Sequence, residues 1–212
     1  MTGPGTAAAF ALLEAGGLPL PPNTTQLLEQ YCGLIRAFNP VCGLVSKGDV
    51  HRLEERHIVD SLSLAPVLWR RGLADGRLLD IGSGGGFPAI PLKVALPGLD
   101  VTLVERSAKR SGFLRKVIGA LGLQGVRVVM GSFPEDIGEG PWDVVAARAV
   151  DKPTAVMRAV MGMLPEDCVF LCQFGEPESS DAAMFHVEQI EDEWSRQGLR
   201  RGSLHIIQRL SA

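Results

Sequence analysis

Three features of the sequence predict an α/β fold in which a mostly parallel, Rossmann-like sheet follows an N-terminal helical cap. From Arg77 onward, short β-branched runs alternate with helical segments, the pattern of parallel strands joined by crossover helices. Before that point, the spacing of apolar residues is helical. The first strand leads directly into a glycine-rich turn, which is typical of a ligand-binding sheet. We therefore expect a helical cap over residues 1–75, packed on a core over residues 76–212.

Composition and charge limit the classes of function. The 212 residues, 46% hydrophobic and 21% charged, are enough to bury a core in one large domain. A net charge of -3 gives no overall basic field, so binding to nucleic acid needs a local basic patch. We find no secretory leader and no apolar run of the roughly 18 residues that a membrane span needs, and we expect a cytoplasmic protein.

The four cysteines predict no metal site. They include no C-x-x-C pair, and no histidines stand at zinc-finger spacing; the cysteines are Cys32, Cys42, Cys168 and Cys172. Thiols of this kind are among the most buried side chains in proteins that are not secreted. We expect all four to be reduced and buried.

The cap is expected to contain three helices. Apolar residues recur at helical spacing within residues 8–13, 27–38 and 58–69. A Pro-Pro-Asn sequence at residues 21–23 precedes the second run and is typical of a helix start. In the third run, one apolar stripe extends from Ile58 to Trp69, so we expect both side chains to face the core.

The core is expected to contain six strands. They are RLLDI (77–81), DVTLVE (100–105), VRVVM (126–130), WDVVAA (142–147), DCVFLC (167–172) and SLHIIQRL (203–210). Helical segments follow the earlier strands, which makes these parallel. No helix follows the last run, so we interpret it as an antiparallel edge strand. Residues 175–202 are polar and show no pattern that we can interpret.

The turn after the first strand, DIGSGGG (80–86), is the strongest sign of a ligand site. Ligands of open α/β sheets bind beyond the carboxyl ends of the strands. Gly82, Gly84 and Gly86 place no Cβ atom between the backbone and a ligand. The helix expected over residues 87–96 would point its free N–H groups into the same space. A tight turn that binds nothing is the alternative interpretation.

Two cofactor classes fit this turn. With Ala89 as its last position it matches the dinucleotide pattern G-x-G-x-x-A, and Glu105 could then bind a ribose hydroxyl. With Asp80 as its first position it matches the D-x-G-x-G-x-G turn of class I S-adenosylmethionine (SAM) methyltransferases. A carboxylate would repel a pyrophosphate, and Pro88 offers it no N–H, so both residues favour SAM. Glu105 would then bind the ribose diol of SAM.

Four stretches are more specific than the glycines alone. They are ERHIVDSL (55–62), DIGSGGGFPAIPL (80–92), LVERSAKRSGFLRKV (103–117) and WDVVAARAV (142–150). Together they resemble the bacterial 16S rRNA (guanine-N7) methyltransferases, the glucose-inhibited division protein B family. The resemblance implies a class I SAM-methyltransferase fold and transfer of a methyl group to N7 of one guanine in 16S rRNA. The expected partner is 16S rRNA or the small ribosomal subunit, bound by a monomer with no DNA or membrane partner.

The resemblance also implies individual cofactor contacts. They fall on Gly82, Phe87, Phe133, Pro134 and Arg148. The sequence departs from the family in two places. The segment GSFPED (131–136) stands where the family usually has the motif R-A-E. Gln173-Phe174 stand where a lysine and a glycine are common.

Basic side chains at the edge of the expected cleft are the candidates for binding RNA. Lys109 and Arg110 lie in the first turn of the helix that follows the second strand. Arg110 falls on the buried arc of this helix, where an unpaired guanidinium would be costly, so we expect it to project into the cleft mouth. Arg148 ends the strand WDVVAA. It either pairs with Asp151 or binds the cofactor carboxylate or a target phosphate.

The cap contributes a polar stripe. Arg56, His57 and Asp60 stand three and four residues apart, so they can share one side of a helix. The stripe is either a surface ion pair of Arg56 with Asp60, or it faces the cleft and orients the guanine or SAM. In the second case Arg56 and His57 are candidates for RNA contact.

The expected chemistry asks little of the side chains. N7 of guanine carries a lone pair and no proton, so the enzyme must align the reactants and needs no general base. A carboxylate near the purine would stabilise the charge that the ring acquires, and Asp60 is the candidate. The alternatives are a small-molecule methyltransferase on the same core, an NAD-dependent oxidoreductase and a non-enzymatic ribosome-binding protein.

Overall fold

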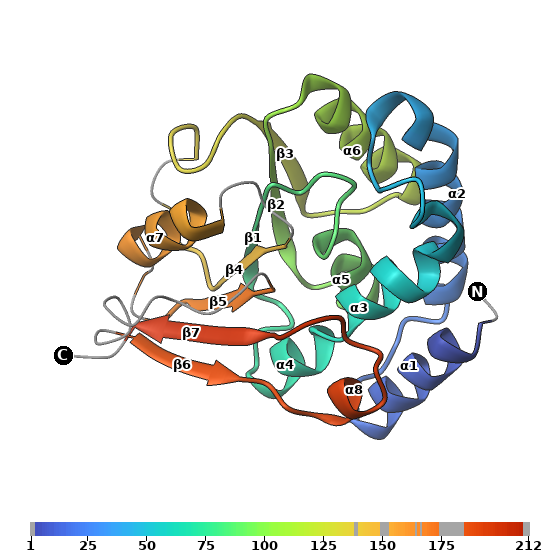
Figure 1. The fold of residues 1–212 in the computed structure, drawn as a ribbon, viewed down its shortest axis with the longest axis horizontal. Helices are drawn as coiled ribbons and strands as arrows, with labels where there is room; N and C mark the ends of the chain where they lie inside the picture. The colour runs from blue at the N-terminus through green and yellow to red at the C-terminus, as the bar shows by residue number, and fades with distance from the viewer. Residues whose placement is uncertain are drawn as a thin grey trace.

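The computed structural model describes residues 3–137, 140–148, 153–163, 165, 167–173 and 185–209. Their centre is a seven-stranded sheet in the order β3-β2-β1-β4-β5-β7-β6 (Figure 1). Strands β1 to β5 run parallel, and β7 is antiparallel to both β5 and β6. This confirms the predicted α/β fold. The strands are β1 (Arg77–Ile81), β2 (Asp100–Glu105), β3 (Val126–Met130), β4 (Val144–Ala147), β5 (Val169–Cys172), β6 (Phe185–Gln189) and β7 (His205–Arg209).

All six predicted strands are present, together with one that the sequence did not reveal. β7 is antiparallel as expected, but the prediction that it forms the edge is wrong, because β6 pairs along its other side. β6 lies within the stretch 175–202 that shows no clear pattern. An edge strand need not bury either face, and in β6 only Phe185 is buried, so its alternation of apolar residues is too short to recognise.

The N-terminal segment is helical, as predicted, but its third part is broken into short pieces. Ser63 and Leu64 form a turn that interrupts the helical phase of the expected stripe. Trp69 is therefore 39% exposed, while Ile58 is buried. The elements are α1 (Pro4–Ala15), α2 (Thr24–Cys42), the 3-10 turn η1 (Val50–Arg52), the π-helical turn η2 (Glu54–Ile58), α3 (Val59–Leu62) and α4 (Ala65–Arg70).

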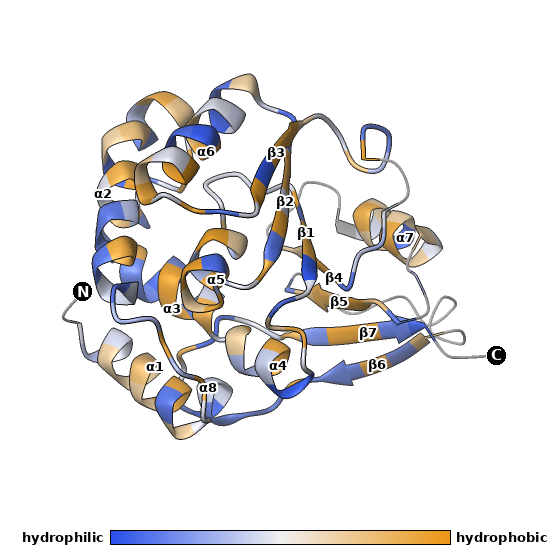
Figure 2. Ribbon diagram, turned by 180° about the vertical axis from the view of Figure 1, so that it is seen from behind, coloured by the Kyte–Doolittle hydropathy of each residue, from blue (hydrophilic) through white to orange (hydrophobic). Residues whose placement is uncertain are grey.

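Helices cover the two faces of the sheet unequally (Figure 2). One face packs on α7 in an apolar cluster around Phe170. The other face packs on α5, α6 and the cap in one continuous cluster, which joins Leu62 of the cap to Leu78 of the sheet. Cap residues therefore reach the strands directly. The remaining helices are α5 (Ala89–Ala95), α6 (Ala108–Leu121), α7 (Pro153–Met163) and α8 (Glu193–Arg196).

The cysteines are free thiols. Cys32, Cys168 and Cys172 are buried as predicted, whereas Cys42 is only half-buried. In the part of the chain that the structure describes, no cluster of histidine, cysteine and acidic side chains could hold a metal ion. Within the same residues, no helix has the length and apolar character to cross a membrane.

Candidate active site

The glycine-rich turn joins β1 to α5 at the carboxyl edge of the sheet. Gly82, Gly84 and Gly86 have φ angles of 70°, 54° and 100°, which residues with a Cβ rarely adopt. A Cβ on Gly84 would meet nothing closer than 3.8 Å, whereas one on Gly86 would lie 2.6 Å from Ile90 Cγ1 and 3.0 Å from Tyr31 Oη. The expectation that all three glycines make room for a ligand is therefore corrected. Gly86 makes room for the core, while Gly84 faces open space.

Helix α2 of the cap contacts this turn through Tyr31. The Tyr31 hydroxyl donates a 2.6 Å hydrogen bond to the Gly85 carbonyl, across 54 residues of sequence. The Tyr31 ring also packs against that of Phe87, with 5.4 Å between centroids. In the sequence, Tyr31 is one position of a helical stripe, so spacing alone could not reveal this contact. The conformation of the turn thus depends on the cap.

Asp80, the fourth residue of β1, is a buried carboxyl group near the Ser83 hydroxyl and the Arg148 guanidinium. Its exposure is 0%, and neither side-chain oxygen has a hydrogen-bond partner in the described part of the chain. The Ser83 hydroxyl donates to the main-chain carbonyl of Asp80 at 3.0 Å. Burial raises the pKa of the Asp80 carboxyl to about 7, although the Ser83 hydroxyl and the Arg148 guanidinium act in the opposite direction. Because a buried charge is costly unless it meets an opposite one, this position suits the cationic end of a ligand.

Glu105, at the end of β2, organises the neighbouring turns. Its Oε2 accepts the Gly84 N–H at 2.9 Å, and its Oε1 accepts the Ser107 N–H at 2.8 Å. Each carboxylate oxygen keeps a further lone pair. The side chain lines a cleft together with Gly82 and Arg110. Glu105 can therefore hold the glycine turn in place and still accept hydrogen bonds from a diol.

The segment after β3 forms another wall of this cleft. Phe133 lines it beside Gly131 and Ser132. Pro134 follows in the same turn, and its carbonyl accepts the Ile137 N–H at 3.2 Å. Since proline has no N–H, a main-chain donor to a ligand in this turn must come from another residue.

Two side chains of the cap bind Arg148, which directly follows β4. Its Nη1 donates to Asp60 Oδ2 at 2.5 Å, across 88 residues of sequence, and its Nη2 contacts His57 Nδ1. The guanidinium carbon lies 5.4 Å from the centre of the Phe87 ring. Asp151, the other expected partner, lies outside the described residues. Arg148 thus joins the cap to the ligand edge of the sheet.

The polar stripe expected at Arg56, His57 and Asp60 is split between different partners. Arg56 pairs with Asp49 at 2.8 Å and not with Asp60, so the expected surface ion pair is wrong. The π-helical turn η2, which contains Arg56 and His57, changes the spacing before α3. Burial and the nearby Arg148 guanidinium lower the pKa of His57 to about 4. His57 is therefore neutral near pH 7 and accepts from Arg148 through Nδ1.

Both oxygens of Asp60 are occupied. Oδ2 accepts from Arg148, and Oδ1 accepts the main-chain N–H of Arg201 at 2.7 Å. The residue is only 3% exposed. This geometry does not support the expectation that Asp60 faces a purine. Its contacts orient Arg148.

Of the two basic candidates on α6, only Arg110 lines the cleft. Its Nε donates to the Cys42 carbonyl at 3.4 Å and its Nη2 to the Gly43 carbonyl at 3.1 Å, so it also caps the end of α2. This agrees with the expected projection into the cleft mouth. Lys109 is exposed, and its main-chain carbonyl accepts the Cys42 thiol at 3.8 Å.

Gln173, directly after β5, is a half-buried residue whose amide atoms are buried. Neither atom of its amide is hydrogen-bonded in the described part of the chain. Cys172 is in register with Ala147 of β4, so Gln173 stands beside Arg148 at the ligand edge. Phe174 lies outside the described residues. Together with Asp80, this places two unsatisfied polar side chains at the carboxyl ends of strands that flank β4.

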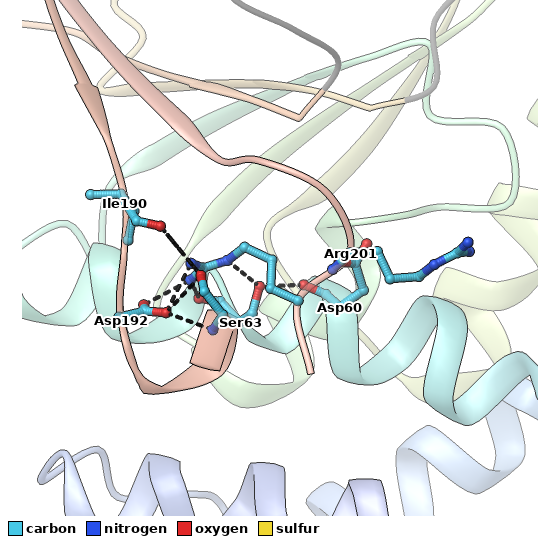
Figure 3. A network of polar contacts seen from close by, with 7 residues as sticks. Asp60, Ser63, Ile190, Asp192 and Arg201 are labelled. Carbon is cyan, nitrogen blue, oxygen red and sulfur yellow. Dashed lines mark hydrogen bonds and ion pairs between the residues drawn. The ribbon is translucent and has the colours of Figure 1, made fainter. Parts of the chain in front are cut away.

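Sequence reasoning gave no role to Arg200, whose side chain is fully buried. Figure 3 shows its network, which joins the loop before β7 to the cap. The guanidinium forms a bidentate pair with Asp192, with distances of 2.9 and 2.8 Å, and donates to the Ser63 hydroxyl at 3.1 Å and the Ser63 carbonyl at 3.0 Å. A charged residue in a polar stretch gives no local sign of such burial, because its partners are far away in the sequence.

The sheet order, the glycine turn after β1 and the buried acid before it define a class I SAM-dependent methyltransferase. Solved structures share this fold. A candidate O-methyltransferase from Klebsiella pneumoniae has a TM-score of 0.59 at 15% identity, with 97% of each chain covered. A mutant of MtNAS in complex with S-adenosylmethionine has a TM-score of 0.56 at 16% identity, with 88% of this chain and 73% of that one covered.

The family follows from the sequence comparisons. The family model described as rRNA small subunit methyltransferase G matches residues 24–197. A protein of Stenotrophomonas maltophilia (strain K279a), named ribosomal RNA small subunit methyltransferase G, is 36% identical over 172 residues, or 80% of this chain and 78% of that protein. One of the same name from Leptothrix cholodnii is 32% identical over 185 residues, 84% of each chain. The chain belongs to the rRNA small subunit methyltransferase G family.

Proposed function

We propose that this protein transfers a methyl group from SAM to N7 of one guanine in 16S rRNA. Family membership makes it a SAM-dependent rRNA methyltransferase. The choice of N7 and of one guanine in 16S rRNA is the finer part of the proposal. The observation that carries the cofactor site is the cleft lined by Gly82, Glu105 and Phe133, at the end of the strand that holds the buried Asp80 carboxyl.

The described residues fit SAM. We infer that Asp80 receives the cationic methionyl end, where a positive charge would offset the cost of burying the carboxylate. Glu105 would accept from the ribose diol, and Phe133 would flank the adenine across the cleft. Arg148 uses only part of its five N–H groups on the cap, so it can also reach the methionine carboxylate.

The reaction transfers one carbon. Bound SAM supplies an electrophilic methyl group on a sulfonium. The in-plane lone pair of guanine N7 attacks the methyl carbon, the N7–C bond forms as the S–C bond breaks, and the bonding pair stays on sulfur. Because N7 carries no proton, no side chain has to accept one. The neutral, engaged His57 agrees with this, and the main task of the chain is alignment.

The target base must leave its stack to reach the cofactor, because the major groove of an RNA duplex is too deep and narrow for side chains. Arg110 at the cleft mouth, with the exposed Lys109 on the same turn, is suited to hold the RNA backbone next to the extruded base. We further propose that the protein acts in the cytoplasm, as a monomer.

The decisive experiment is methyl transfer by the full chain. Methyl-labelled SAM is incubated with 16S rRNA and with small subunits from a strain that lacks this protein, and the product is mapped by mass spectrometry. We expect label on N7 of a single guanine, and no label with Asp80→Asn. Label on another atom, or none on either substrate although SAM binds, would overturn the proposal.

A further inference from the structure

A second cavity lies on the cap, outside the cofactor cleft. It is formed by the N-terminal turn of α1 at Gly5, by the turns η1 and η2 with the start of α3 at Val59, and by the loop after α8. Its lining includes Arg52, Arg56 and Arg201. We call this cavity the arginine pocket. A chain with a net charge of -3 has no general reason to gather three guanidinium groups around one cavity.

The charges in the arginine pocket are only partly compensated. Arg52 pairs with Glu55, the only acidic side chain in its lining, at 3.1 Å. Arg56 pairs with Asp49 at 2.8 Å. The side chain of Arg201 points away from the network around Asp60 in Figure 3, and among the described residues its guanidinium has no hydrogen-bond or ion-pair partner. The pocket therefore keeps an excess of positive charge.

Helix α1 adds to this field. It begins at Pro4 and is 12 residues long, so the positive end of its dipole is directed at the pocket where Gly5 lines it. In the first turn of α1, Pro4 has no N–H and the Thr6 N–H donates to the Gly3 carbonyl at 3.0 Å, so the Gly5 N–H is the main-chain donor left for an anion, beside guanidinium groups that suit several oxygens. Gly5, Arg52 and Arg56 belong to the N-terminal cap, and Arg201 joins them from the C-terminal loop.

Hydrogen bonds link the pocket to the cofactor site. Arg200 anchors the loop to Ser63 and Asp192, as described above, and the main-chain N–H of Arg201 donates to Asp60 Oδ1 at 2.7 Å. The other oxygen of Asp60 holds Arg148. A single carboxylate therefore separates the backbone of Arg201 from the arginine at the ligand edge of the sheet.

We propose that the arginine pocket binds a backbone phosphate of the rRNA substrate, away from the target guanine. The inference rests on the proposed function and extends it. Phosphates supply most of the affinity of proteins for nucleic acids and fix its register, and Arg binds them in a bidentate manner. The Glu55 carboxylate opposes an anion, so a phosphate in the pocket would compete with it for Arg52.

The test measures rRNA binding and methyl transfer with the full chain. Arg201→Ala removes the free guanidinium but keeps the main-chain N–H that binds Asp60. We expect its kcat/KM for 16S rRNA to fall about tenfold, with the slope of log affinity against log salt reduced by about one. Affinity for S-adenosylhomocysteine, measured by calorimetry, should not change. Arg196→Ala is the matched control, because Arg196 is an exposed arginine of α8 that lies outside the pocket lining.

Glu55→Gln provides a change of opposite sign. It removes the carboxylate that competes for Arg52, so we expect tighter binding of rRNA. If Arg201→Ala methylates rRNA as well as wild type does, with an unchanged salt slope, the phosphate site is refuted while the proposed function stands. A pocket that bound only free phosphate or an acidic peptide would also leave rRNA methylation unchanged in Arg201→Ala, and this outcome likewise refutes the rRNA phosphate site. If wild type methylates no rRNA, the proposed function fails first and this inference fails with it.

Discussion

The glycine turn and the junction between the cap and the C-terminal loop each bury a charged residue, but they differ in how that residue is hydrogen-bonded. At the turn, Asp80 is fully buried, and no well-formed hydrogen bond reaches its carboxyl oxygens in the described part of the chain. At the junction, Arg200 is buried and all its side-chain nitrogens donate, to Ser63, Ile190, Asp192 and Ser195. Buried polar groups of folded proteins are normally satisfied. The junction is thus a structural site, and the unsatisfied carboxyl at the turn supports our proposal that the turn binds a ligand.

The largest expected effect comes from replacing Arg200, the buried and fully hydrogen-bonded residue of the junction. Arg200→Ala leaves Asp192 and Ser63 without their partner, and we expect a loss of about 3–5 kcal/mol in the free energy of unfolding, measured by denaturant titration. Arg200→Lys should lose less, because a lysine keeps the charge without the bidentate geometry. Arg196→Ala, which removes only an exposed pair with Glu193, should stay within about 0.5 kcal/mol of wild type. Equal effects of Arg200→Ala and Arg196→Ala would contradict our description of the junction.

The next largest effect comes from replacing Asp80, the buried carboxyl at the glycine turn. Asp80→Asn should weaken binding of SAM at least about 100-fold, since the charge that meets the cationic group is lost. Calorimetry measures this affinity. The same variant should be more stable than wild type at pH 8. The folded pKa of about 7 lies above the ordinary value of 3.8, so ionisation of Asp80 costs stability as pH rises from 4 to 7, and below pH 4 the advantage should vanish. A variant that binds SAM normally would remove Asp80 from the site.

A smaller effect comes from pH alone. Below its pKa of about 7, Asp80 is protonated in the free protein, and a cationic ligand binds better to the carboxylate. We expect affinity for S-adenosylhomocysteine to rise about tenfold from pH 6 to pH 8 and then level off, with proton release on binding at pH 6. His57, with a pKa of about 4, does not titrate in this range. Affinity that is flat with pH would show that Asp80 is ionised before the ligand arrives.

The smallest effect tests how the two regions are joined. Tyr31→Phe removes the hydrogen bond to Gly85 without changing the packed ring, and should cost about 1 kcal/mol of stability. Because this bond holds the glycine turn, affinity for S-adenosylhomocysteine should fall as well. Under conditions in which Arg200→Lys is folded, it should be less stable than wild type but bind S-adenosylhomocysteine with unchanged affinity. If Tyr31→Phe lowers stability alone, the cap does not shape the cofactor turn.

Local patterns predicted most of the sheet and its turn. RLLDI and DVTLVE match β1 and β2 residue for residue, because β-branched and apolar runs bounded by turn residues leave few other conformations. The same holds for the turn from Asp80 to Gly86, where the residues that matter are consecutive. β6 was not predictable, because a half-exposed edge strand has too little apolar alternation.

The sequence by itself determined strands β1 to β5 and β7, the glycine turn and the acidic residues at the strand ends, because each depends on neighbours within a few positions. Only the tertiary structure decided which polar groups are satisfied. Asp60 binds Arg148 and Arg201 across 88 and 141 residues of sequence, and Arg200 binds Ser63 across 137. The periodicity of a sequence carries no information about contacts at such separations. The physical reason is that the free energy of a buried charge depends on what packs around it, and that is settled only when the cap, the sheet and the C-terminal loop come together.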